Sequence, residues 1–153
     1  MKDIKNLLKK KLATHFLTMK PFRHIRIKVG YRDEHEYISF IRSVVSAEIK
    51  KKEFNQLCFF GSGEHTSLVF RADPQIRELT SYICDNNPSL WGTTKFGIDI
   101  ISPEKAVKIC DAIFLSTAVS QDAMRKQLKK INFNGTIFSP DDNVPTEWFK
   151  DLF

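Results

Sequence analysis

The fold is decided by the stretch Leu57-Cys58-Phe59-Phe60-Gly61-Ser62-Gly63-Glu64-His65-Thr66. An apolar run enters a Gly-x-Gly turn that is followed by residues able to open a helix. A nucleotide-binding strand–turn–helix unit begins in this way. The two glycines let backbone N–H groups approach a phosphate, and the helix N-terminus adds the positive end of its dipole.

Asp85 strengthens this interpretation. It closes the next apolar segment, Tyr82-Ile83-Cys84-Asp85, at about 20 residues beyond the glycines, where a ribose-binding carboxylate belongs. The two features together predict a nucleotide-type site but do not identify an activity.

From Leu57 onward, short apolar runs alternate with helical stretches, and parallel strands need such crossovers. We expect an α/β fold: a Rossmann-like open parallel sheet of about five strands with helices on both faces. The predicted strands are 57–60, 79–84, 97–101, 112–116 and 136–138, and the predicted helices are 64–72, 103–109 and 121–131.

Capping residues support the helix starts. Ser102 is followed by Pro103 at the first helical position, and Ser120 can cap the helix that follows it. The turn-rich loop from Asp85 to Phe96 contains Trp91, which is interpreted either as a lid over the site or, preferably, as a plug at the sheet edge.

Residues 1–55 are predicted to be a basic, mostly helical arm, and residues 56–153 the Rossmann-like domain with an apolar C-terminal tail. The arm holds 14 Lys and Arg against 6 Asp and Glu, a net charge of +8, whereas the remainder carries −2. An amphipathic helix is expected over 5–20, an extended segment over 23–31, and a second helix from Asp33 to about Phe54. A solvated helix face explains the basic residues adequately.

The chain has 153 residues, enough for one core of ordinary size. Its three cysteines lie in or beside apolar runs without metal-binding spacing, so they are predicted to be buried thiols. Met1 to Lys11 is broken by lysines, and no apolar stretch approaches a membrane span of roughly 20 residues. A cytoplasmic location without a signal peptide or transmembrane segment is therefore expected.

In an open parallel sheet the ligand crevice lies beyond the carboxyl ends of the strands, where the winding direction reverses. If strands 57–60 and 112–116 flank that point, the glycine turn faces the segment 116–120. The candidate cofactor-binding residues are Gly61, Ser62, Gly63, Glu64, His65, Thr66, Asp85, Ser116 and Thr117. Ser116 and Ser120 have helix capping as an alternative role.

Two details differ from an ordinary dinucleotide site. Thr66 replaces the third glycine, so the helix cannot approach the strand as closely. Glu64 competes with phosphate for the helix terminus, although a protonated His65 could offset it. His65 is more simply a capping or ligand-contacting residue than a general acid or base, and no catalytic residue is assigned.

A resemblance emerges from the glycine turn together with three further motifs. The chain over about 55–140 resembles small Rossmann-like, CoA-binding-like accessory domains of nucleotide-sugar and polysaccharide-biosynthesis proteins. The motifs are Phe60-Gly61-Ser62-Gly63-Glu64-His65-Thr66, Asp85-Asn86-Asn87-Pro88, Gly97-Ile98-Asp99-Ile100-Ile101-Ser102-Pro103-Glu104 and Asp111-Ala112-Ile113-Phe114-Leu115-Ser116. The resemblance implies that Gly61, Ser62, Gly63 and His65 line the nucleotide-side loop and that Asp85 lies near the ribose. No Tyr-x-x-x-Lys pair follows any tyrosine, so the short-chain dehydrogenase relay is missing.

The leading hypothesis is an accessory module of sugar or surface-polysaccharide metabolism, without catalysis of its own, that binds a nucleotide, a nucleotide-sugar or a coenzyme such as NAD(P) or CoA. The alternatives are a methyltransferase-like core and a degenerate scaffold for protein–protein interaction. Nucleic acid is disfavoured because the basic residues alternate with aliphatic rather than stacking aromatic residues. The apolar tail 144–153 predicts either a homodimer contact, or docking onto the sheet; a glycan-biosynthesis protein is the other candidate partner.

Overall fold

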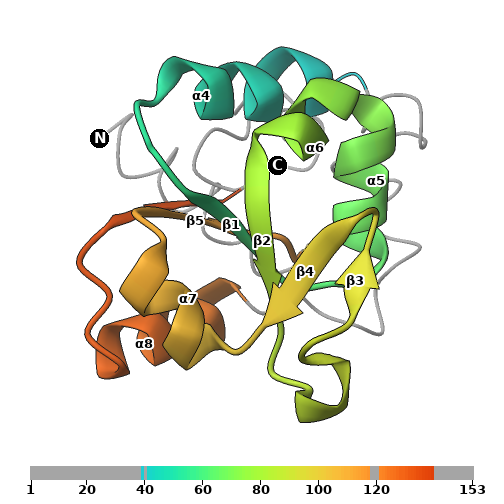
Figure 1. The fold of residues 1–153 in the computed structure, drawn as a ribbon. Helices are drawn as coiled ribbons and strands as arrows, with labels where there is room; N and C mark the ends of the chain where they lie inside the picture. Colours follow the sequence, from blue (N-terminus) through green and yellow to red (C-terminus); the bar gives the residue numbers. More distant parts are fainter. Residues whose placement is uncertain (1–38, 40, 118–120, 140–153) are drawn as a thin grey trace, which may run out of the picture.

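The computed structural model describes residue 39, residues 41–117 and residues 121–139 (Figure 1). These residues form a six-stranded sheet in the order β3-β4-β2-β1-β5-β6. The strands are β1 (Leu57–Phe60), β2 (Thr80–Cys84), β3 (Thr94–Lys95), β4 (Ile98–Ile101), β5 (Ala112–Leu115) and β6 (Thr136–Phe138). All neighbouring pairs are parallel except the antiparallel β3–β4 pair.

The five parallel strands follow the winding of a Rossmann-like α/β sheet. The chain runs outward from β1 through β2 to β4, then returns to β5 on the other side of β1 and continues to β6. The direction therefore reverses between β1 and β5, which pair along their full length from Leu57–Ala112 to Phe60–Leu115. This confirms the predicted fold class and puts the glycine turn at the switch point.

Both faces of the central strands are buried, and alternate residues serve different faces. In β1, Leu57 and Phe59 belong to one core, while Cys58 and Phe60 belong to the other. In β5, Phe114 faces the first core and Leu115 the second. Continuous apolar runs are what a parallel sheet covered on both faces requires.

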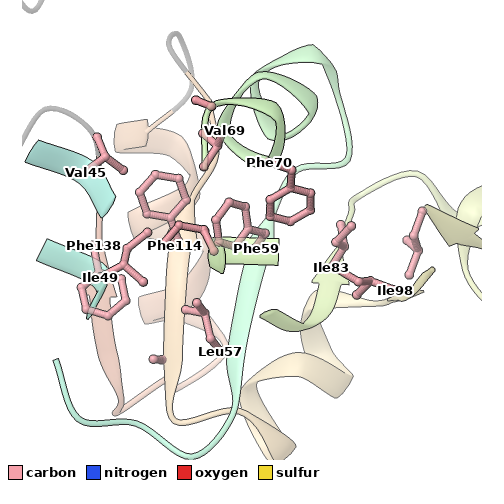
Figure 2. Packing of buried hydrophobic residues seen from close by; sticks show 14 residues of the cluster. Val45, Ile49, Leu57, Phe59, Val69, Phe70, Ile83, Ile98, Phe114 and Phe138 are labelled. Carbon is pink, nitrogen blue, oxygen red and sulfur yellow. The ribbon is translucent and has the colours of Figure 1, made fainter. Parts of the chain in front are cut away.

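The first core is rich in aromatic rings (Figure 2). The ring centroid of Phe59 lies 4.9 Å from that of Phe70 and 4.7 Å from that of Phe114. Val45 and Ile49 complete this core from the helical segment that precedes β1. The helical segment 41–51 thus packs against the sheet.

Helices cover both faces, as expected. The first core is covered by η2 (Ile41–Val45), α4 (Ser46–Lys51), α5 (Glu64–Ala72) and α6 (Pro74–Leu79). The second core is covered by α7 (Pro103–Ile109) and α8 (Gln121–Lys130). Ser102 caps α7 by accepting a hydrogen bond from the Lys105 N–H, with Pro103 in the first turn, which confirms that predicted start.

Three elements were not expected from the sequence: helix α6, the short 3-10 helix η3 (Pro88–Leu90) and strand β3. Helix α6 begins at Pro74 after Asp73, whose side chain accepts the Gln75 N–H, so a normal helix start was overlooked. Strand β3 forms a hairpin with β4 in the connection that was expected to be a loop.

Other boundaries shift slightly or cannot be compared. The helix before β1 ends at Lys51 and not near Phe54, because Lys52 is already extended. The expected helix 5–20, the extended segment 23–31, the cap Ser120 and the tail 144–153 lie outside the described residues.

Candidate functional site

The glycine turn at the end of β1 packs closely against the end of β5. Gly61 has a φ of +113°, and a Cβ built there would lie 3.0 Å from the backbone oxygen of Ser116. Its N–H donates to the carbonyl of Cys84 at 2.8 Å, so the turn is also tied to β2. Gly61 is therefore required for both its backbone conformation and its close approach to β5.

Ser62, in the middle of the turn, is bound to Asp85 at the end of β2. Its N–H and its hydroxyl both donate to Oδ2 of Asp85, at 3.0 and 2.6 Å. The other carboxylate oxygen, Oδ1, accepts the N–H of Asn87 at 2.9 Å. Because a carboxylate offers about four acceptor positions, Asp85 keeps capacity for one more hydrogen bond at Oδ1.

Asp85 is held in its charged form by these donors. Burial alone would raise the pKa of Asp85, but the Ser62 hydroxyl, the Asn87 and Ser62 N–H groups and the charge of Lys95 together lower it. Lys95 also donates from Nζ to the carbonyl oxygen of Ser62. A carboxylate and an ammonium group thus hold the same serine of the turn.

A chain of hydroxyl groups joins the start of α5 to the end of β5. Thr66 Oγ1 lies 2.5 Å from the carbonyl oxygen of Gly61 and 2.7 Å from Ser116 Oγ, and Ser116 Oγ lies 3.0 Å from His65 Nδ1. The Gly61 carbonyl can only accept, so Thr66 donates its one proton there. Ser116 then donates to Thr66, and His65 donates from Nδ1 to Ser116. This proton order requires a proton on Nδ1 of His65.

The protonation state of His65 agrees with this order. Burial lowers the pKa of His65 from 6.5 to about 4, because the imidazolium form would lose solvation. The imidazole is neutral at pH 7, so it does not offset the charge of Glu64. His65 can therefore offset the charge of Glu64 only at acidic pH, where the imidazole is protonated.

Gly63 has a different role from Gly61. It is the residue before the first turn of α5, with a φ of −80°, and its side-chain position would meet nothing within 4 Å. No side chain caps this helix start. The turn is therefore open to approach at Gly63, as a phosphate- or hydroxyl-binding turn needs.

The first part of the connection from β2 to β4, residues 85–92, lies beyond the carboxyl end of β2, and β3 then runs back alongside β4 (Figure 1). It contains η3 (Pro88–Leu90), which Asn87 caps by accepting the Ser89 N–H. The indole N–H of Trp91 donates to the backbone oxygen of Asp85 at 2.7 Å, and Trp91 is 41% exposed. A partly exposed ring at this position is compatible with a lid over the site and with a plug at the sheet edge, so both interpretations stay predictions.

A reciprocal amide pair fastens the same connection to α8. Asn86 donates to Gln127 at 2.9 Å, and Gln127 donates back at 2.7 Å. The loop that carries Trp91 is thereby attached to the helix that follows β5.

The structure brings together most of the residues that the sequence singled out. Gly61, Ser62 and Asp85 form one connected group, and His65, Thr66 and Ser116 form another that meets it at Gly61. Gly63 and Glu64 are exposed at the start of α5, and Thr117 accepts from Gln121 through its backbone oxygen. Their roles in binding stay predictions.

Two positively charged side chains near the carboxyl ends of the strands were not predicted from the sequence. Lys95 reaches the turn from β3, and Arg125 of α8 donates to the Ser139 hydroxyl at 3.1 Å, just after β6. Only the hairpin geometry shows Lys95 near Ser62, because no local pattern of residues indicates this contact.

The thiols match their prediction. Cys58, Cys84 and Cys110 are buried and free, and all three belong to the second core. Within the part of the chain that the structure describes, no acidic, histidine and cysteine side chains are grouped as metal ligands. The same residues contain no helix long and apolar enough to cross a membrane.

The fold is that of a Rossmann-like α/β domain with a glycine turn at its switch point. No protein family, curated protein or solved structure matches this chain in the three comparisons made.

Proposed function

We propose that this domain binds a nucleotide-type ligand at the carboxyl ends of β1 and β5 and serves as an accessory module rather than an enzyme in its own right. The observation that carries the proposal is the Gly61–Thr66 turn at the point where the strand order reverses, with Asp85 at the end of the adjacent strand. The resemblance to accessory domains of nucleotide-sugar enzymes supports a nucleotide-sugar, CoA or NAD(P) as the ligand class.

The charges at the turn favour the sugar portion of such a ligand over a pyrophosphate. Glu64 stands in the first turn of α5, where its carboxylate interacts with the positive end of the helix dipole. Asp85 adds a second negative charge, neutral His65 adds none, and the Lys95 ammonium, which donates to the Ser62 carbonyl, offsets only one of the two carboxylates. The remaining acceptor position of Asp85 suits one ligand hydroxyl.

Gly63 gives a clean test, because a side chain there would project into open space without disturbing the fold. Calorimetry of the full chain with ATP, UDP-glucose, NAD⁺ and CoA is expected to find a ligand. Gly63→Val should weaken that binding at least about tenfold, an effect of about 1.4 kcal/mol, while the melting temperature stays unchanged. Gly63→Ala should have a smaller effect on binding.

Two results would overturn the proposal. Binding that is equally strong in Gly63→Val would put the ligand elsewhere. If no compound of the panel binds, the domain is better explained as a scaffold for protein–protein interaction.

A further inference from the structure

Trp91 is a large apolar side chain left exposed beside the candidate site. It follows η3, and its backbone N–H donates to the Pro88 oxygen at 3.2 Å. The next residue, Gly92, donates to the Ile100 oxygen at 2.9 Å. The backbone on both sides of the indole is therefore fixed to the rest of the domain.

The indole itself is also held in place. Its only polar atom donates to the Asp85 backbone oxygen at 2.7 Å, yet 41% of the residue remains exposed. A ring that is fixed before a ligand arrives loses little conformational freedom on binding. Such a ring is suited to stacking against a planar partner.

Asp85 connects this ring to the glycine turn. Its backbone oxygen accepts from Trp91, and its side chain accepts from Ser62. Three features thus follow one another from the loop after β2 to the turn after β1: the planar ring of Trp91, the hydroxyl-accepting carboxylate of Asp85 and the open glycine turn. A nucleoside has the matching order, with a planar base attached to a sugar that bears hydroxyl groups.

We infer that Trp91 is a stacking platform for the base of a nucleoside-containing ligand. This inference rests on the proposed function and narrows it, since a ligand without an aromatic base would leave the ring unused. Trp91 then favours nucleosides and nucleotides over free sugars and sugar phosphates.

The test uses the fluorescence of Trp91 in the full chain. The chain has two tryptophans, so Trp148→Phe leaves Trp91 as the single reporter. Adenosine and uridine are expected to quench this emission saturably, and ribose at the same concentrations is expected to leave it unchanged. Calorimetry with the ligand found in the panel supplies the affinities.

Three variants separate stacking from a structural role. Trp91→Ala should weaken nucleotide binding by about tenfold, whereas Trp91→Phe, which keeps a ring but loses the indole N–H, should retain most of it. Leu79→Ala is the matched control, because Leu79 is equally exposed at 41% but precedes β2 at the opposite edge of the sheet.

The outcomes distinguish this inference from the proposed function. Nucleotide binding that is lost in Gly63→Val but unchanged in Trp91→Ala would overturn the inference and keep the function. A ligand that binds without a base, or nucleoside binding without quenching, would also overturn it. No binding by any compound would refute both.

Discussion

The hydroxyl of Ser62 lies 2.6 Å from a carboxylate oxygen of Asp85 and so joins the turn after β1 to the residue after β2. Both residues had been singled out as ligand contacts, and the structure shows that they also contact each other. Asp85 therefore shapes the turn, in addition to any part it has in binding.

Ser62→Ala should lower the free energy of unfolding by about 1–2 kcal/mol, because it leaves a partly buried carboxylate without its shortest hydrogen bond. Urea denaturation measures the change. Ser67→Ala is the control, since the Ser67 hydroxyl makes only a 3.4 Å contact with the Gly63 carbonyl oxygen. Its removal should change the free energy of unfolding by only a few tenths of a kcal/mol. Equal effects of the two substitutions would show that the Ser62–Asp85 hydrogen bond adds nothing to the stability of the domain.

Gly61→Ala should destabilise the domain by about 1–3 kcal/mol, since a side chain at a φ of +113° is strained. The new Cβ would also press on the Ser116 backbone oxygen at 3.0 Å. Gly63→Ala should be neutral or slightly stabilising, because its φ of −80° suits any residue. Thermal unfolding of the two variants compares them directly, and a reversed order of stability would contradict the turn geometry.

His65 should titrate with a midpoint near pH 4 in the folded protein, because burial lowers its pKa to about 4. NMR of the imidazole C–H resonances measures this value, and His65→Gln identifies the signal by its loss. A midpoint near the ordinary value of about 6.5 would contradict the neutral state of this partly buried imidazole.

The same shift predicts how stability depends on pH. The folded pKa of about 4 lies below the unfolded value of 6.5, so the unfolded chain binds more protons between these values. The contribution of His65 to stability is therefore complete above about pH 6.5 and declines as the pH falls toward 4. Urea unfolding across this interval should show that the free energy of unfolding depends less on pH in His65→Gln than in the original chain.

Asn86 and Gln127 should be energetically coupled by about 0.5–1 kcal/mol, because each amide donates to the other. A double-mutant cycle with Asn86→Ala and Gln127→Ala measures the coupling. Additive effects would show that the loop after β2 is not held to α8 by this pair.

Much of the fold was predictable because the physical signals were local and repeated. The apolar runs of β1 and β5 are long enough to require burial on both faces, and Ser102 with Pro103 marks the start of α7. By contrast, β3 has only two residues, and its turn places Phe96 at a φ of 55°. Phenylalanine is not typical of such a turn, so Gly97, at a φ of 75°, was only a weak local sign of the hairpin.

The site was predictable only in outline. The glycine turn and Asp85 follow recognised spacing, and Ser116 follows from strand order. The bonds of Asp85 to Ser62 and of Lys95 to the same serine depend on how two loops fold toward each other. Such contacts between distant residues have no signature in a single sequence.

All three thiols lie in the second core, beneath α7 and α8, and the described residues of the first core include no cysteine. The rate at which a thiol-reactive reagent modifies the native protein would therefore report how often α7 and α8 move away from the sheet. Comparing its rate with the rate of global unfolding would show whether the two faces of the sheet open together or separately.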